Sequence, residues 1–354
     1  MRLVPRGPVG PVFALLVPLL SVAFAFGASL FLLALFGASP KEAAAAVYQG
    51  LFTDLRGFFE VLRRAVPLVL AGAGLALAFR AQFWNIGAEG QLLLGAVAAA
   101  GVALFSGIEG RWLLPAMALA AFLAGGLWAL LAAVLKARLE VNDVITTLML
   151  NYVAVYLVEW LIHGPWKGKT AFGFAYTDRF PEAASLPLFP GTALAWPGAV
   201  LAVLLAAFFA WLLFATTFGF EVRVLGENPE AARYAGIRAG VTLALVALFS
   251  GGAAGLAGFV EVAGTHHKLL APLQISLGYG YTAIIVAWLA RNHPLLAVLT
   301  GLLIGFVFAA GDVLKVALMV PFQLVEVVNG LVLFFLIAGE VFLRYRVVFG
   351  RRRG

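Results

Sequence analysis

Apolar runs long enough to cross a lipid bilayer recur along this chain and restrict the folds that it can adopt. Several stretches extend for about 18 residues or more with almost no charge, which is the length that a membrane-spanning helix needs. Of all residues, 63% are hydrophobic and 12% are charged, whereas a soluble domain is about half apolar and a quarter charged. We therefore predict an all-α polytopic membrane protein.

We expect about ten transmembrane helices in a single membrane domain that covers residues 1–354. The first apolar run is longer than the core of a signal peptide, so we expect it to be retained as a span. The C-terminal stretch "RYRVVFGRRRG", 344–354, carries five arginines, and such basic segments stay in the cytoplasm. An even number of spans then places both termini in the cytoplasm. The expected spans are 11–36, 62–79, 84–106, 112–135, 144–163, 195–218, 240–263, 273–290, 294–311 and 322–343.

Two polar segments on the expected outer side are too long to be simple connectors. The segment 37–60, which runs into "YQGLFTDLRGFFEVLRR", is expected to lie as an amphipathic helix in the outer membrane interface. The outer loop 164–194 is rich in glycine, proline and aromatic residues, and it can become ordered only by packing on another part of the protein. This loop is either an ordinary surface lid or a docking surface for a soluble partner.

The polar stretch "GENPEAARYAGI" contains the signals of a short helix that is capped at both ends. Asn228 is a good N-cap, Pro229 suits the first helical position, and Gly236 can end the helix in the left-handed conformation. Glu230 and Arg233 match the helix dipole. A helix of about two turns is marginal alone in water. It is either a turn between two spans or a rigid element through which a soluble ATPase moves the membrane domain.

Motifs for catalysis are absent from the sequence. There is no G-x-x-x-x-G-K-[ST] phosphate loop, no H-E-x-x-H zinc motif and no nucleophile elbow. The chain has no cysteine, and the adjacent His266 and His267 lack a carboxylate at a useful spacing for a metal. We therefore expect neither a metal site nor enzyme activity. The net charge of +7 follows the positive-inside rule and does not indicate nucleic-acid binding.

Ionisable residues are sparse in the predicted spans, although ion-driven transporters usually need them there. Four acidic residues lie near span ends, and most of them are interpreted as interfacial: Glu159, Glu261, Glu326 and Glu340. With neither a charge relay nor a nucleotide site, the energy for transport is expected to come from another polypeptide. A stand-alone secondary transporter or channel is the alternative from a different class.

Four stretches resemble ABC importer permeases of the ribose, branched-chain amino acid and nucleoside group. "GENPEAARYAGI" (226–237) resembles their cytoplasmic coupling loop. "FRAQFWNIGAEGQLLLGA" (79–96) resembles the FNIGxEGQ signature of the nucleoside and simple-sugar permeases, with Trp84 as a departure. The same subgroup is resembled by "EVNDVITTLMLNYVA" (140–154) and "LGYGYTAIIVAWLARNHPL" (277–295).

The resemblance extends over most of the chain and implies a type II-like ABC importer membrane domain. A second permease, here a different chain, would complete the pathway, and ABC ATPase subunits would bind ATP and Mg beneath it. An extracytoplasmic substrate-binding protein would deliver the substrate. The implied function is import of nucleosides or related simple sugars by alternating access, with no cofactor in this chain. Ribose-like monosaccharides or branched-chain amino acids are the alternative substrates.

Two groups of candidate site residues follow. The coupling loop, 219–239, contains the residues expected to contact the ATPase: Gly226, Asn228, Pro229, Glu230, Ala231, Ala232, Arg233 and Gly236. Polar residues inside a span are costly against lipid, so they must face another helix or the pathway. The candidates for the translocation pathway are Asn85, Glu89, Gln91, Thr147, Asn151, Tyr279 and Thr282.

Tyr279, Tyr281 and Thr282 are suited to stack on or hydrogen-bond a nucleobase, although a helix contact is an equally good interpretation. A faint internal echo relates 71–95 to 251–283, because each runs from a glycine-rich helix through a loop into another helix. This echo predicts an inverted repeat of the kind that builds many transporters. The glycines of the second segment, Gly251, Gly255 and Gly258, are expected to pack helices together.

Overall fold

The computed structural model describes residues 2–5, 10–35, 37, 39–318 and 345–348, together with isolated positions between 324 and 341. Most of these residues are helical, which confirms the all-α prediction. The described chain divides into two compact units. Unit 1 comprises residues 1–58 and 307–354, and unit 2 comprises residues 59–306. The prediction of a single domain stays a prediction.

Unit 1 contains a long helix, a short amphipathic helix and a strand pair. Helix α1 (Pro11–Leu35) covers the first predicted span, and α2 is Pro40–Phe52. The Ser39 side chain caps α2 by accepting a hydrogen bond from the Glu42 N–H group. Its buried face is formed by Ala43, Val47 and Leu51, which are four residues apart. The strands β1 (Arg2–Pro5) and β2 (Tyr345–Val348) pair in antiparallel register.

The amphipathic helix expected in 37–60 is therefore present, and its location in the membrane interface stays a prediction. The last predicted span, 322–343, lies largely outside the described residues, and so do Glu326 and Glu340. The same holds for most of the basic tail.

Unit 2 contains most of the helices. Eight helical segments of the described residues are long and apolar enough to cross a membrane, and they match the second to ninth predicted spans. The bounds are α3 Leu55–Arg80, α4 Ala88–Phe105, η1 Gly110–Trp112, α5 Leu113–Leu139, α6 Asp143–His163, η2 Glu182–Ala184, α7 Trp196–Ala215, α8 Thr217–Glu227, α9 Pro229–Tyr234, α10 Ala239–Glu261, η3 Val262–His266, α11 Pro272–Ser276, α12 Tyr279–Leu289 and α13 Leu296–Ala317. Helix α3 starts, and helix α13 ends, in unit 1.

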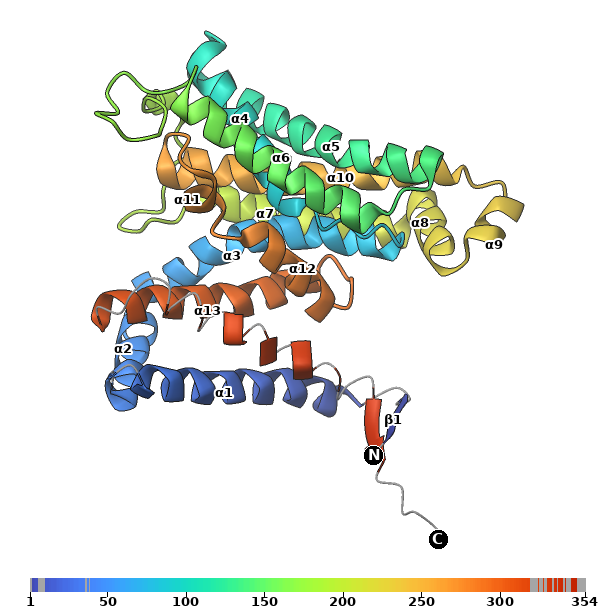
Figure 1. Cartoon of the computed structure of the whole chain (residues 1–354), viewed down its shortest axis with the longest axis horizontal. Helices are drawn as coiled ribbons and strands as arrows, with labels where there is room; N and C mark the ends of the chain where they lie inside the picture. Colours follow the sequence, from blue (N-terminus) through green and yellow to red (C-terminus); the bar gives the residue numbers. More distant parts are fainter. Residues whose placement is uncertain are drawn as a thin grey trace. The chain divides into compact units, whose positions relative to one another are not determined.

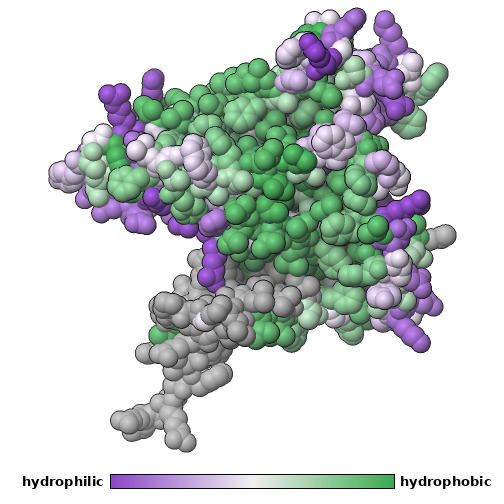
Figure 2. Space-filling model, turned by 180° about the vertical axis from the view of Figure 1, so that it is seen from behind, coloured by the Kyte–Doolittle hydropathy of each residue, from purple (hydrophilic) through white to green (hydrophobic). Residues whose placement is uncertain are grey.

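The long helices of unit 2 run roughly alongside one another, with α9 at one end and the loop 164–194 at the other (Figure 1). We call these the α9 end and the loop end. Figure 2 shows that hydrophobic residues cover the flank of the unit, whereas hydrophilic residues gather towards its ends. This distribution is the one that a lipid bilayer requires of a spanning helical bundle.

Helix α10 packs against its neighbours through glycine, as predicted. A Cβ atom on Gly251 would lie 2.3 Å from the Gly125 carbonyl oxygen, and one on Gly255 would lie 2.1 Å from the Ala121 oxygen. A Cβ atom on Gly258 would lie 2.0 Å from a backbone oxygen of α4. Small residues allow such close approach of helices in membranes, where packing rather than the hydrophobic effect drives association.

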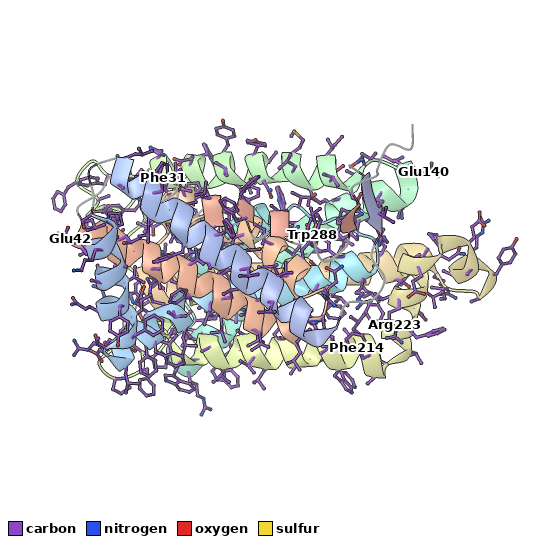
Figure 3. The ribbon with its side chains drawn as sticks, turned by 90° about the horizontal axis from the view of Figure 1, so that it is seen from below. Phe31, Glu42, Glu140, Phe214, Arg223 and Trp288 are labelled. Carbon is purple, nitrogen blue, oxygen red and sulfur yellow. The ribbon has the colours of Figure 1, made fainter. Side chains whose placement is uncertain are left out.

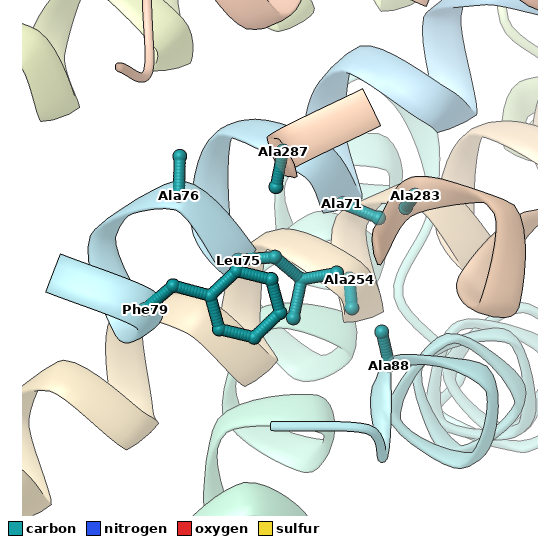
Figure 4. Close-up of a cluster of buried hydrophobic side chains, with 8 residues drawn as sticks. All are labelled: Ala71, Leu75, Ala76, Phe79, Ala88, Ala254, Ala283 and Ala287. Carbon is teal, nitrogen blue, oxygen red and sulfur yellow. The ribbon is translucent and has the colours of Figure 1, made fainter. Parts of the chain in front are cut away.

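Helices α3, α4, α10 and α12 meet in a buried cluster made mostly of alanine side chains (Figure 4). The aromatic member is Phe79, which is tilted against Trp84 with ring centroids 5.3 Å apart. Trp84 also contacts the edge of Trp288 at 6.2 Å. Trp84, the departure from the resembled signature, therefore covers one side of this helix junction.

Two predicted spans differ from the observed helices. The predicted span 84–106 begins at Trp84, whereas α4 begins at Ala88, after the N-cap Gly87. The span 273–290 is divided into α11 and α12 by Leu277 and Gly278, which both have positive φ. Hydropathy does not detect such breaks, because the residues at them are themselves largely apolar. Both segments of the predicted inverted repeat run from helix to loop to helix, and the repeat itself stays a prediction.

Candidate functional site

The irregular segment before α4 is held by polar side chains of α6. The Ile86 N–H group donates to the Thr147 hydroxyl at 3.1 Å, and the Gly90 N–H group donates to the Asn151 Oδ1 at 2.9 Å. The Asn151 amide returns a hydrogen bond to the Ile86 carbonyl at 2.9 Å. Within a bilayer, backbone groups that leave the helical pattern must find such partners in the protein. Asn151 and Thr147 thus supply hydrogen-bond partners to backbone groups at the start of α4.

Asn85 and Gln91 form a second part of this polar network. Their side-chain amides exchange two hydrogen bonds, of 2.9 Å and 2.7 Å. Asn85 also donates to the Ser250 hydroxyl at 3.1 Å and accepts from the Gly87 N–H group at 3.1 Å. Ser250 is the midpoint of the 23-residue helix α10, so α4 begins deep inside the unit.

Glu89 lies where the N-termini of α4 and α12 meet. Its Oε2 accepts from the Gly280 N–H group at 2.9 Å, in the first turn of α12. The free N–H groups of a helix N-terminus favour a carboxylate. A Cβ atom on Gly280 would lie 2.2 Å from the Glu89 backbone nitrogen, so the two helix starts are in direct contact. We call this contact the α4–α12 junction.

The three residues at the start of α12 face different surroundings. Tyr279 is fully buried, and its hydroxyl accepts from the Arg64 Nη1 at 2.8 Å. Thr282 is buried as well. Tyr281 is 41% exposed, and its hydroxyl lies 3.4 Å from the Asn151 Nδ2. Tyr281 is therefore the aromatic side chain that connects the network to the surface of the chain.

All seven residues predicted for the pathway are buried within this single chain. The structure joins five of them around the start of α4, namely Asn85, Glu89, Gln91, Thr147 and Asn151. The other two, Tyr279 and Thr282, lie in the first turn of α12. Their role in a pathway remains a proposal.

Sequence reasoning missed a group of charged residues at the loop end of the unit. Glu60, Arg63 and Arg64 on α3 are half-buried, and Glu261 at the end of α10 is only 2% exposed. Glu261 is therefore buried within the protein at the end of α10, and its position at the membrane interface stays a prediction. A signal was available in "EVLRR", since Glu60 lies three and four residues before the two arginines and shares a helix face with them.

His266 does have a nearby carboxylate, contrary to the sequence analysis. Its Nε2 lies 3.6 Å from the Glu261 Oε2. The turn that joins them, η3, is a π-helix, in which residues five apart come onto one face. Spacing rules for an α-helix do not anticipate this pair. Among the described residues, no group of three or more metal-ligating side chains comes together.

The α9 end contains the short helix as its sequence predicts. The Asn228 Oδ1 accepts from the Glu230 and Ala231 N–H groups, each at 3.0 Å. Pro229 occupies the first turn, and Gly236 has a φ of +77°. The helix α9 is therefore capped at both ends, as predicted. Its Tyr234 side chain, which was not among the predicted residues, is 88% exposed. Ala232 is buried, and the exposed predicted residues are Asn228, Pro229, Glu230, Ala231, Arg233 and Gly236.

Helix α8 attaches α9 to the rest of unit 2. A Cβ atom on Gly226 would lie 1.9 Å from the Arg80 carbonyl oxygen, so α8 touches the end of α3. Arg223 lies over the Phe214 ring, as Figure 3 shows, and Phe214 stacks on His293 with centroids 4.8 Å apart. Gly226 is thus a packing residue rather than part of α9.

The turn between α12 and α13 also contacts the end of α3, which α8 touches. The Arg80 Nε donates to the Asn292 carbonyl at 3.2 Å. Arg291 and Asn292 both have positive φ, at 52° and 55°. Because α12 runs from this turn back to the α4–α12 junction, the α9 end and the junction belong to one connected framework.

The loop 164–194 is ordered by backbone contacts with the segment that follows α10. The Thr177 N–H group donates to the Leu269 carbonyl at 3.1 Å, and the Phe180 N–H group donates to the His267 carbonyl at 2.8 Å. A third bond of 2.9 Å joins Leu186 to Ala263. The loop is therefore fixed to η3, as the packing requirement predicts.

Two titratable groups of this region have shifted pKa values. Backbone N–H groups of Thr170 and Lys169 hold the pKa of the Asp178 carboxyl below its usual value. Burial lowers the pKa of His267, and the nearby Arg179 guanidinium adds to this effect. Phe172, by contrast, is 91% exposed at the tip of the loop.

Residues 57–337 match the family model described as branched-chain amino acid transport system / permease component. The chain belongs to this permease family. The match includes the α4–α12 junction, the charged residues of α3 and the capped helix α9. The family predicted from the resembled stretches is thus confirmed, and the chain is a membrane-embedded permease of many helices.

Relatives in this permease family match nearly the whole chain. The glucose ABC transporter permease protein TsgB13 of Haloferax volcanii is 40% identical over an alignment 367 residues long. The alignment covers 99% of this chain and 95% of that protein. The guanosine ABC transporter permease protein NupP of Bacillus subtilis is 30% identical, with 91% and 92% covered. The nucleoside ABC transporter permease protein NupB of Lactococcus lactis is 28% identical, with 91% and 90% covered.

Proposed function

We propose that this chain is the membrane permease subunit of an ABC importer for nucleosides or related simple sugars. The observation that carries the proposal is similarity over almost the full length to permeases whose named substrates are glucose, guanosine and nucleosides. Glucose and nucleosides are neutral molecules rich in hydroxyl groups. The amides, hydroxyls and aromatic ring among the candidate pathway residues suit such molecules, because they offer hydrogen bonds and stacking, while the Glu89 carboxylate is already bonded to the start of α12.

In the proposed assembly, α9 docks into an ABC ATPase subunit that binds ATP and Mg. The capped ends of α9 and the exposed Tyr234 ring support this role, because a rigid helix with an exposed aromatic anchor suits a protein groove. This arrangement puts the α9 end in the cytoplasm of a prokaryote and the loop end outside the inner membrane. Both termini would then be cytoplasmic.

The loop 164–194 would face the substrate-binding protein that delivers the substrate. Its exposed Phe172 and its basic residues offer an anchor and a positive rim to such a partner. A second permease, proposed to be a different chain, would cover the face that carries Tyr281 and complete the pathway. Alternating access would follow when ATP-driven movement of α9 passes through α8 into α3 and the α12–α13 turn.

Branched-chain amino acids are the second candidate substrate, because the family model bears their name. They are zwitterions, and their carboxylate needs an unoccupied anion site. At the α4–α12 junction the helix N-terminus of α12 is already occupied by the Glu89 carboxylate. The junction therefore favours a neutral substrate.

The experiment that tests the function is uptake by the purified complex in vesicles. The complex is isolated from native membranes through a tag on this chain, and radiolabelled guanosine, glucose or leucine is added with ATP on the α9 side. We expect ATP-dependent accumulation of guanosine or glucose and none of leucine. A non-hydrolysable ATP analogue is the control. Accumulation driven by an ion gradient, in vesicles that hold only this chain, would overturn the proposal.

A further inference from the structure

The charged residues at the loop end form a connected cluster, which no function described so far uses. On α3, the Arg63 Nε donates to Glu60 at 2.9 Å, and the Arg64 Nε lies 3.6 Å from the same carboxylate. The Arg64 Nη1 donates to the Tyr279 hydroxyl at 2.8 Å. Arg64 therefore connects the start of α3 to the first residue of α12.

Glu261 adds the end of α10 to this cluster. Its carboxylate lies within electrostatic reach of Arg63 and Arg64, and it is 3.6 Å from the His266 Nε2. The cluster thus contains two carboxyl groups and two guanidinium groups. Three helices that are far apart in sequence meet in it.

Stability alone is a weak explanation for this cluster. Burying charged groups costs free energy that their mutual attraction often fails to recover, and apolar replacements are frequently as stable. Such groups are best explained where they select one of two arrangements. Here the cluster ends on Tyr279, and the next residue, Gly280, donates its N–H group to Glu89. The cluster therefore fixes the helix start that closes the α4–α12 junction.

We propose that Arg64 is a positioning residue for transport, acting through Tyr279. It holds the start of α12 against α4 while the junction is closed, and the junction opens when this bond is released. Glu60, whose carboxylate lies 3.6 Å from the Arg64 Nε, helps to keep the guanidinium in place. The loop 164–194 is bonded to η3, and His266 of η3 lies beside Glu261, so a protein that docks on the loop acts on the cluster through η3. This inference rests on the proposed transport function.

The absence of cysteine allows a direct measurement of junction opening. Thr282 is buried in the first turn of α12, so Thr282→Cys would react with a maleimide only when α12 moves away from α4. In this background, Tyr279→Phe removes only the hydroxyl that Arg64 binds. Loss of one charged hydrogen bond should speed the labelling by about 10-fold. Tyr156→Phe, on the exposed face of α6, is the matched control and should leave the rate unchanged.

Transport by the reconstituted complex supplies the second readout. Tyr279→Phe and Arg64→Met should lower the substrate imported per ATP hydrolysed, and Arg64→Lys should restore part of it. The double variant should be no worse than the more affected single variant, because both remove the same bond. A lower melting temperature with unchanged labelling and unchanged uptake per ATP would overturn the proposal. If instead the proposed transport function is wrong, the unaltered complex itself will show no ATP-dependent uptake, which distinguishes this outcome from failure of the inference about Arg64.

Discussion

Buried polar side chains in this permease satisfy backbone groups where helices begin deep inside the bundle. Asn151 holds both the Gly90 N–H group and the Ile86 carbonyl, and Glu89 holds the Gly280 N–H group. The residue types were predictable, since a polar residue in a span must face protein or a pathway. Their partners were not predictable, because these lie about 60 to 190 residues away in sequence.

Replacing Asn151 by Leu leaves two buried backbone groups without their partner. We expect a loss of roughly 1–3 kcal/mol for an unsatisfied buried group and reduced uptake, with the ATPase still bound. Thermal unfolding in detergent and uptake in vesicles measure the two effects. Tyr152→Phe, on the neighbouring exposed position, is the control. Unchanged uptake kinetics in Asn151→Leu would remove this residue from the proposed pathway.

Gly280→Ala tests the contact between the two helix starts. The added methyl group would lie 2.2 Å from the Glu89 backbone nitrogen, so α12 has to move away from α4. Overpacking of this kind costs about 1–3 kcal/mol, which a lower melting temperature reports. Gly240→Ala is the control, because its methyl group would meet its nearest neighbour at 3.9 Å. Equal melting temperatures for the two variants would contradict the contact.

At the scale of helices, sequence signals from adjacent residues predicted helix ends correctly. Hydropathy, averaged over a whole span, did not predict where a helix is interrupted. The ends of α9 follow from Asn228, Pro229 and Gly236, because capping depends on a few adjacent residues. The loop before α4 was predicted from its sequence, whereas the break inside 272–289 was missed, since hydropathy continues through Leu277 and Gly278. The π-helical turn η3 was missed for the same reason, and with it the pairing of Glu261 with His266.

Helix α9 offers a test at this scale. Gly236→Pro cannot adopt the observed φ of +77° and lacks the N–H group that bonds the Arg233 carbonyl. We expect ATP hydrolysis to continue while uptake per ATP falls by about 10-fold or more. Gly236→Asn is the matched control, since asparagine tolerates the left-handed conformation. Normal uptake in the proline variant would show that α9 is only a turn.

At the scale of the whole permease, unit 2 joins two ends through one set of helices. Helix α8 contacts the end of α3, Arg80 of α3 is bonded to the α12–α13 turn, and α12 leads from that turn to the α4–α12 junction. The loop 164–194 is bonded to η3 at the other end. A movement of α9 therefore has a continuous packed route to the junction, which is the physical requirement for coupling between distant sites.

The central claim is that α9 binds an ATPase, and site-specific cross-linking tests it most directly. Tyr234→Cys would be the single cysteine of the chain, on an exposed side chain of α9. A short bifunctional reagent is applied to native membranes, and the product is identified by mass spectrometry. We predict a cross-link to a protein with a G-x-x-x-x-G-K-[ST] loop, and none to that protein from Phe172→Cys at the loop end. If Tyr234→Cys gives no such product in membranes that still transport, the coupling role of α9 is contradicted.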